Sequence, residues 1–294
     1  MNIIITLFIF VLVLFIYLHT FYHLKTSNDL EVFEVSNLSK ERLEEVCDIR
    51  QPLTFYLDVS CFDKLALDEI EKLYSSFDIN IRNTTQKNAN TELRLPLVLS
   101  NAKRVLNEDQ DSKFYSENNE EFLKETSLIK ILKSNDNFLR PSMLMFNNYD
   151  YIIGSENTKT LLRYDINYRN FLLVIDGSAT IKLTPPQSSK YLFPDIDYDN
   201  FEFRSPINPW QPQEEYKNEF NKIKCLDVNL DKGKLLFIPA YWWYSIKFNT
   251  KSTTILSFKY RTYMNNVAIL PYIIKHYLQK QNIKHNIIEK IQTI

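Results

Sequence analysis

The sequence predicts a mainly β domain, built as a double-sheet jelly roll with flanking helices, behind an N-terminal transmembrane helix. Two observations lead to this prediction: a long apolar run opens the chain, and short β-rich segments separated by turn signals fill its second half. The chain has 294 residues, of which 45% are hydrophobic, as is typical of a globular protein with a real core. We therefore expect one sizeable domain after the apolar run.

The apolar run extends from residue 3 to residue 24, ahead of the first charged side chain, Lys25. A helix needs about 20 residues to cross the hydrocarbon layer, so we interpret residues 1–25 as a membrane anchor. A cleaved signal peptide is the main alternative. Against it, no Lys or Arg precedes the run and no small-x-small cleavage site follows it.

The charges beside the run predict its orientation. Basic residues follow the run and none precedes it: Lys25, Lys40, Arg42 and Arg50. Because positively charged flanks stay on the cytosolic side, we expect a single-pass membrane protein whose domain faces the cytosol.

Between the anchor and residue 140, the sequence predicts helices around a first strand. Ser39 is a suitable N-cap for a short helix through Val46, and residues 54–57 are expected to form a strand. The polar run 84–91 is expected to be a loop, and residues 118–132 a helix with one apolar side.

After residue 140, the chain changes to short strands. They are expected at residues 151–153, 161–162, 171–175, 180–183, 235–238, 242–246 and 254–258. Gly177 and Gly233 mark turns between them. The connection 185–224 is rich in aromatic residues, which disordered segments lack, so we expect it to pack as a lid over one end of the barrel. Residues 266–294 have apolar side chains at helical spacing and are expected to form an amphipathic helical tail.

Charge, cysteine and glycine content exclude several classes of protein. The net charge is -1, so no overall field favours nucleic acid as a partner. The three cysteines are widely spaced, which argues against a disulfide framework or a zinc knuckle. Only three glycines occur, and no P-loop, GxGxxG or GxSxG motif is present. The abundance of Ile, Asn, Lys, Tyr and Phe is typical of an AT-rich coding genome, such as that of a large DNA virus or a parasite.

Two segments carry a family resemblance. The run TLLRYDINYRNFLLVIDGSATIKLTPP covers residues 160–186, and DKGKLLFIPAYWWYSI covers residues 231–246. Together with RQP at 50–52 and IIG at 152–154, these segments resemble the cupin-like Jumonji-C oxygenases, and especially the branch that contains the asparaginyl hydroxylase of hypoxia-inducible factor. The resemblance extends over about residues 31–260. It implies a double-stranded β-helix, the cupin barrel, which in active members holds Fe(II) and 2-oxoglutarate.

The metal site that the resemblance implies lacks two of its three ligands. Active members use two histidines and one carboxylate. In the matching positions this chain has Arg163 and Asp165 for the HxD motif, and Tyr244 for the distal histidine. The four histidines of the chain are His19, His23, His276 and His285. The barrel strands therefore cannot supply two histidines, and a tail histidine that reaches in is the remaining alternative.

The positions that the resemblance assigns to the cosubstrate are also altered. The lysine that would bind the distal carboxylate of 2-oxoglutarate falls on Ala179, and a late asparagine falls on Ser257. Thr160 and Asn170 match polar positions on the cosubstrate side, but each would also serve as an ordinary strand hydroxyl or amide. We therefore expect neither Fe(II) nor 2-oxoglutarate as a cofactor.

Arg163 and Asp165 are expected to point together into the barrel, because residues i and i+2 of a strand share a face. A guanidinium can bind a carboxylate through two hydrogen bonds, so we expect Arg163 to replace the metal as the cation beside Asp165. The alternative is a salt bridge on the outer surface. Trp210 and Trp242 are expected to line a pocket, although aromatic residues are more often part of a core.

These observations predict a membrane-anchored cupin-like protein, a catalytically inactive pseudo-oxygenase that acts as a binding or assembly module. The alternative is an Fe(II)/2-oxoglutarate-dependent hydroxylase-type enzyme with atypical metal ligation. We expect an anchor at 1–25, a cupin-like Jumonji-C-type domain at 26–265 and the helical tail at 266–294. The expected partners are the membrane, through the anchor, and a second copy or another protein, through the tail. Packing of the tail on the barrel is the simpler alternative.

Overall fold

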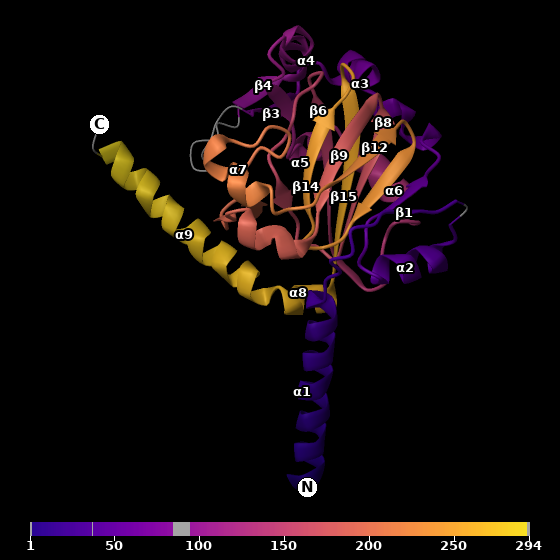
Figure 1. Cartoon of the computed structure of the whole chain (residues 1–294), viewed down its shortest axis with the longest axis vertical. Helices are drawn as coiled ribbons and strands as arrows, with labels where there is room; N and C mark the ends of the chain where they lie inside the picture. Colours follow the sequence, from indigo (N-terminus) through magenta and orange to yellow (C-terminus); the bar gives the residue numbers. More distant parts are fainter. Residues whose placement is uncertain (1, 37, 85–94, 293–294) are drawn as a thin grey trace.

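A computed structural model of the chain describes residues 2–36, 38–84 and 95–292. Apart from Thr84, the loop expected at 84–91 therefore lies outside the described residues. The described chain forms a projecting N-terminal helix, a barrel of two sheets flanked by helices, and a long C-terminal helix (Figure 1).

The larger sheet has nine strands in the order β1-β2-β13-β8-β15-β6-β5-β3-β4. Their bounds are β1 Phe33–Glu34, β2 Leu53–Tyr56, β3 Asp78–Asn83, β4 Leu95–Val98, β5 Phe114–Ser116, β6 Leu144–Gly154, β8 Arg169–Asp176, β13 Lys234–Ile238 and β15 Thr253–Thr262. Neighbouring strands are antiparallel, except that β1 and β2 are parallel.

The smaller sheet has six strands in the order β10-β11-β7-β14-β9-β12, all antiparallel to their neighbours. Their bounds are β7 Arg163–Tyr164, β9 Ser178–Thr184, β10 Asp195–Asp197, β11 Glu202–Arg204, β12 Leu226–Asp231 and β14 Trp243–Phe248. Two antiparallel sheets whose strands alternate along the chain confirm the mainly β barrel that the sequence predicts.

The larger sheet is buried on both faces, which is why its central strands read as continuous hydrophobic runs. In β8, Leu172 and Val174 pack against the smaller sheet, whereas Phe171 and Leu173 pack under the helices. Successive side chains of a strand point to opposite faces, so both faces must be apolar. The domain therefore has three layers: helices, larger sheet and smaller sheet.

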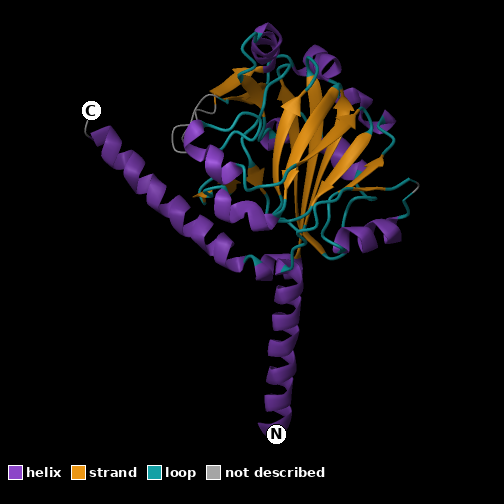
Figure 2. Cartoon of the chain, in the orientation of Figure 1, coloured by secondary structure: helices purple, strands orange, loops and turns teal. Residues whose placement is uncertain are grey.

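Short helices surround the barrel, as Figure 2 shows. Their bounds are α2 Lys40–Asp48, η1 Ser60–Leu65 (3-10), α3 Leu67–Tyr74, α4 Leu99–Glu108, α5 Glu120–Glu125, α6 Ile129–Asn135, η3 Pro186–Tyr191 (3-10), α7 Glu214–Phe220 and α8 Tyr263–Ala268. Those from α2 to α6 bury their apolar sides on the outer face of the larger sheet. The hydroxyl of Ser39 accepts a hydrogen bond from the Arg42 N–H at 3.2 Å, so this N-cap is confirmed.

Three expected elements differ in the structure. The helix expected at 118–132 is interrupted between α5 and α6, where Ser127 has a φ of 58° that no α-helix tolerates. The strand expected at 161–162 begins instead at Arg163, where pairing with β11 and β14 starts. The connection 185–224 contributes β10 and β11 to the smaller sheet, so it is part of the barrel wall as well as a cover.

The helices at the two chain ends are α1 Asn2–Leu24 and α9 Leu270–Gln292. Every side chain of α1 from Ile3 to Leu18 is exposed, and Figure 1 shows α1 projecting away from the barrel. Residues Ile3–Leu24 are long and apolar enough to cross a membrane. Near the other end of α1, His23 is buried and its Nε2 lies 3.3 Å from the Thr262 hydroxyl, and α8 packs beside it.

Candidate functional site

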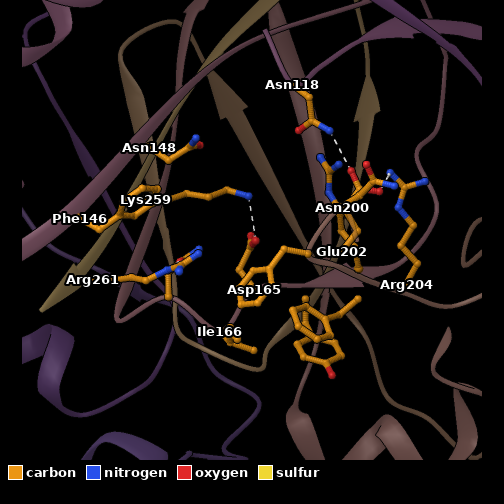
Figure 3. A pocket seen from close by; sticks show the side chains of 15 residues that line it. Asn118, Phe146, Asn148, Asp165, Ile166, Asn200, Glu202, Arg204, Lys259 and Arg261 are labelled. Atoms are coloured by element: carbon orange, nitrogen blue, oxygen red, sulfur yellow. Dashed lines mark hydrogen bonds and ion pairs between the residues drawn. The ribbon is translucent and has the colours of Figure 1, made fainter. Parts of the chain in front are cut away.

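A polar cavity of about 180 Å³ lies between β7, β11 and the end of β15 (Figure 3). Six charged side chains line it: Arg163, Asp165, Glu202, Arg204, Lys259 and Arg261. Both Arg163 and Asp165 therefore face this cavity. We refer to it below as the charged cavity.

Asp165, immediately after β7, has a partner for each of its carboxylate oxygens. Lys259 Nζ lies 2.8 Å from Oδ1, and the Tyr244 hydroxyl donates to Oδ2 at 2.9 Å. Burial alone would raise the pKa of Asp165, but Lys259 outweighs it and lowers that pKa below its usual value. Asp165 is therefore an ionised carboxylate whose two oxygens are already bound.

The cation beside Asp165 is thus Lys259, and the expected Arg163–Asp165 pair is wrong. Arg163 instead forms an ion pair with Glu117 and lies over the Tyr244 ring, 5.1 Å from its centroid. The reason is the strand geometry. β7 ends at Tyr164, so Arg163 stays in register opposite Arg204 and Tyr244, whereas Asp165 lies beyond the paired segment and meets β15 of the other sheet.

Glu117 lies behind the lining of the cavity and forms ion pairs with arginines from three different elements. Besides Arg163, its carboxylate pairs with Arg82 at 3.0 Å and Arg204 at 3.4 Å. The Glu117 side chain is only 2% exposed. Burial would raise the pKa of Glu117, but the arginines outweigh it and lower the pKa to about 2. Arg204 and Arg82 also share Glu202 at 2.6 Å each, so the arginines and carboxylates form one network.

Tyr244, which the resemblance matches to the distal histidine, acts as a hydrogen-bond donor to Asp165. Its side chain is buried and lies on β14 opposite Arg163. Burial raises the pKa of Tyr244 to about 12, so the phenol keeps its proton at neutral pH. A protonated phenol that donates to Asp165 does not replace an imidazole as a metal ligand.

None of the four positions expected on the cosubstrate side belongs to the lining of the charged cavity, although the Asn170 side-chain oxygen accepts a hydrogen bond from the lining residue Asn167. The Thr160 N–H donates to the Ile246 carbonyl at 2.8 Å, and the Thr160 hydroxyl accepts from the Ile246 N–H at 2.9 Å. The Asn170 amide donates to the Ile238 carbonyl at 3.2 Å. Both side chains thus hold strands together. Ala179 and Ser257 are buried within the barrel.

Ala179 lies in the apolar core between the two sheets. Its strand partners are Leu230 and Phe248, and all three belong to one buried cluster. Leu172 and Ile255 of the larger sheet complete this cluster from the opposite side. The space beside Ala179 is therefore filled with hydrocarbon and offers no cation to a carboxylate.

Neither tryptophan lines the charged cavity, and their expected role in lining a pocket stays a prediction. Trp242 is fully buried in the core between the sheets. Trp210 donates its indole N–H to the Ser245 hydroxyl at 2.8 Å and lies under Lys182. Ser245 alternates with the inward-facing Tyr244 and Ile246, so Trp210 packs on the outer face of the smaller sheet.

The donor atoms around Asp165 do not fit the Fe(II) site that the resemblance implies. Among the described residues, no group of three His, Cys, Asp or Glu side chains could hold a metal ion. Two fixed cations, Lys259 and Arg163, lie on either side of the single carboxylate that remains and would repel a ferrous ion. His276 does not reach in, since its Nδ1 lies 2.5 Å from the Tyr198 carbonyl.

Sequence reasoning missed Lys259, Arg261, Glu117 and Arg204. For Lys259 and Arg261 a signal was present, because residues 257–261 read Ser-Phe-Lys-Tyr-Arg and alternate polar with aromatic residues. In a strand buried on both sides, such alternation places polar groups in an internal site. Glu117 has no comparable signal, since nothing around it in the sequence indicates that it is buried.

Comparison with known proteins places these observations in a family. A sequence model of the family described as "Cupin-like domain" matches residues 29–266. The chain is 30% identical over 103 residues to JmjC domain-containing protein D of Dictyostelium discoideum, which is 35% of this chain and 23% of that protein. It is 29% identical over 96 residues to HSPB1-associated protein 1 of Bos taurus and of Homo sapiens, which is 32% of this chain and 20% of each relative. The matches thus span less than a quarter of the length of these curated relatives.

Proposed function

The chain belongs to the cupin-like domain family, and from that premise we propose that it is a membrane-anchored, catalytically inactive cupin-like protein whose barrel acts as a binding module. The observation that carries this proposal is the state of Asp165. Both of its carboxylate oxygens are bound by Lys259 and Tyr244, at the positions where active relatives would hold a metal. Ligation would require Asp165 to give up both partners in exchange for a cation beside Arg163.

The Lys259 ammonium beside Asp165 also stabilises the fold without a metal ion. An ionised carboxylate buried without a partner costs several kcal/mol, and Lys259 removes most of that cost. In an active relative the metal would be the cation that does so. Here the protein supplies the cation from its own strand, so its barrel is complete without a metal.

We further assign residues 1–25 as an anchor, residues 26–265 as the cupin-like domain on the cytosolic side, and residues 266–294 as the tail. The exposed apolar surface of α1 and the basic residues that follow it support this assignment. Carbonate extraction of membranes that contain the full chain tests the anchor. Release into the supernatant, or a mature N-terminus near residue 24, would indicate a cleaved signal sequence instead.

Turnover of 2-oxoglutarate tests the catalytic part of the proposal. We expect the full chain, supplied with Fe(II), ascorbate and 2-oxoglutarate, to form no more succinate than its Asp165→Ala variant. That variant is the matched control, because it removes the one remaining carboxylate of the site. Succinate formation that requires Asp165 would favour the alternative, a hydroxylase-type enzyme with atypical metal ligation.

A further inference from the structure

Arg261 lines the charged cavity without a counter-ion of its own. Its Nε donates to the Asn167 side-chain oxygen at 2.5 Å, and its guanidinium lies between the rings of Phe146 and Phe201, at 4.8 and 4.9 Å from their centroids. Among the described residues, no carboxylate forms an ion pair with it. Burial lowers the pKa of Arg261 to about 10, so it is still a cation at neutral pH.

The lining of the charged cavity as a whole is electropositive. It contains four cationic side chains and two carboxylates. Asp165 is already matched by Lys259, and Glu202 by Arg204 of the lining and by Arg82 behind it. Arg163 and Arg204 also pair with the buried Glu117, which leaves Arg261 as the lining cation that forms no ion pair among the described residues. A partly buried guanidinium without a carboxylate is the kind of group that an anionic ligand stabilises.

A second, larger cavity of about 800 Å³ shares Arg261, Phe146 and Phe201 with the charged cavity. The rest of its lining is mostly apolar and comes from the start of β6, from α8 and from the first turns of α9. We call it the apolar groove; its main side chains are Met145, Met264, Val267, Leu270, Ile273 and Tyr277. Val267 is 41% exposed and Leu270 48% exposed, so the groove opens to the surroundings of the protein.

The apolar groove lies at the end of the barrel from which α1 projects. α8 packs against α1, and Figure 1 shows α8 and the beginning of α9 beside the C-terminal end of α1. If α1 crosses the membrane, as proposed above, the groove lies at the membrane surface and its exposed side chains face the lipid head groups.

We infer that the charged cavity and the apolar groove together bind an anionic amphiphile, meaning one carboxylate or phosphate head group on an acyl chain. The head group lies against Arg261 in the charged cavity, and the chain lies in the apolar groove. A cavity of about 180 Å³ has room for a small head group only, whereas about 800 Å³ is in the range of sites that bury a whole small ligand.

The position of Arg261, Phe146 and Phe201 in the lining of both cavities decides between this ligand and other occupants. An apolar helix of a second copy would fill the groove but would leave Arg261 facing hydrocarbon, which is costly for a charge. A free inorganic anion would match Arg261 but would leave the exposed apolar side chains uncovered. An amphiphile satisfies both ends, and each buried CH₂ contributes about 0.8 kcal/mol.

The test uses the full chain in phosphatidylcholine nanodiscs with a photoactivatable fatty acid that carries a diazirine within its chain. Cross-linked peptides are identified by mass spectrometry. We expect cross-links in residues 263–277, reduced at least ten-fold in Arg261→Gln and in Leu270→Asn and unchanged in Arg42→Gln, an exposed arginine far from the groove. Arg261→Lys keeps the charge and should keep the labelling, which guards against simple misfolding of the Gln variant.

Competitors separate the contributions of head and chain. Unlabelled fatty acid and lysophosphatidic acid should both suppress the cross-links, whereas inorganic phosphate at the same concentration and the neutral methyl ester should not. Cross-links confined to α1, equal labelling of Arg261→Gln and wild type, suppression by phosphate alone, or covalent dimers through 263–277 in place of lipid adducts would overturn the inference.

The inference rests on the proposed anchor. Incorporation of the chain into the nanodiscs tests the anchor independently of the cross-links that test the ligand. A chain that incorporates but gives no cross-links in residues 263–277 refutes the ligand and leaves the anchor intact. A chain that stays outside the discs, yet is labelled in residues 263–277 through Arg261, refutes the anchor and supports the ligand.

Discussion

The Asp165 carboxylate shows how a single strand position decides the character of this site. Lys259 lies on β15 of the larger sheet and Tyr244 on β14 of the smaller sheet, so Asp165 joins the two sheets across the mouth of the barrel. The resemblance implies a metal bound by three side chains at these positions. In this chain the Tyr244 phenol and the Lys259 ammonium bind the Asp165 carboxylate. The site is therefore held by hydrogen bonds between its own residues.

A double-mutant cycle measures the strength of the Asp165–Lys259 pair. We expect Asp165→Ala and Lys259→Ala each to lower the free energy of unfolding by about 3 kcal/mol, because each strands a charge in a largely buried site. The loss in the double variant should be smaller than the sum of the two single losses by more than about 1 kcal/mol. Denaturant melts of the full chain in detergent give all four values.

The control for this cycle is the exposed pair Lys217–Glu214 on α7, whose coupling should be below about 1 kcal/mol. The cycle between Arg163 and Asp165 should also give the smaller coupling, because these two side chains form no ion pair. Additive losses for Asp165 and Lys259 would show that the pair does not form.

Glu117 predicts how stability changes in acid. Its pKa is near 4.5 when unfolded and about 2 in the fold, so its contribution is fully present above about pH 4.5 and is lost as the pH falls towards 2. A shift of this size corresponds to on the order of 3 kcal/mol. We expect Glu117→Gln to lower stability at pH 7 and to flatten the unfolding free energy between pH 4.5 and 2. The exposed Glu214→Gln should keep the wild-type slope, and an unchanged slope in Glu117→Gln would contradict the buried network.

Sequence could predict which positions form this site but not which of them pair. The resemblance of their segments to the Jumonji-C oxygenases placed Arg163, Asp165 and Tyr244 near one another, and strand alternation placed Arg163 and Asp165 on one face. The partner of Asp165 depends on where β15 of the opposite sheet crosses β7, at a separation of 94 residues along the chain. No local pattern contains that information.

At the scale of the elements, the inner faces of β8, β9 and β14 explain why the barrel is packed rather than hollow. Leu172 and Val174 on one sheet meet Ile181 and Ile246 on the other. Phe248 reaches across to Gly154 at the end of β6, where a Cβ atom would lie 2.2 Å from its ring. Ala179 belongs to the same packed cluster of apolar side chains.

Gly154→Ala should therefore destabilise the domain by about 1 to 3 kcal/mol through overpacking against Phe248. Shortening the ring with Phe248→Leu in the same chain should recover part of this loss. Gly177→Ala is the control: its cost comes from a φ of +74° and from contacts of the new Cβ with Thr250 and Thr253, so Phe248→Leu should not relieve it. Thermal melts of the six chains, which are wild type, Phe248→Leu and each alanine variant with and without Phe248→Leu, measure these costs. An equal cost of Gly154→Ala in both backgrounds would mean that Phe248 does not fill this space.

The strands could be predicted from the sequence better than the helices. Residues 171–175 and 254–258 are long apolar β-branched and aromatic runs, and both are strands, although each strand extends further than predicted. The helix expected at 118–132 was divided because Ser127 turns the chain, and a serine at that position carries no obvious stop signal. β10 and β11 were missed because strands of three residues give no measurable period.

At the scale of the whole molecule, one end of the barrel brings together the two terminal helices and the cavities on which the proposals rest. α1, α8 and the beginning of α9 meet there, and both cavities lie at that end or beside it. The opposite face is covered by α2 to α6.

Metal content tests the central claim most directly, because the proposal requires that Asp165 stays bound to Lys259 and Tyr244. The full chain is purified in detergent, incubated with Fe(II) under anaerobic conditions with and without 2-oxoglutarate, passed through a gel-filtration column and analysed for iron, manganese and zinc. We predict far less than one metal ion per chain, and no difference between wild type and Asp165→Ala. About one iron per chain that is retained by the wild type and lost in Asp165→Ala would contradict the account.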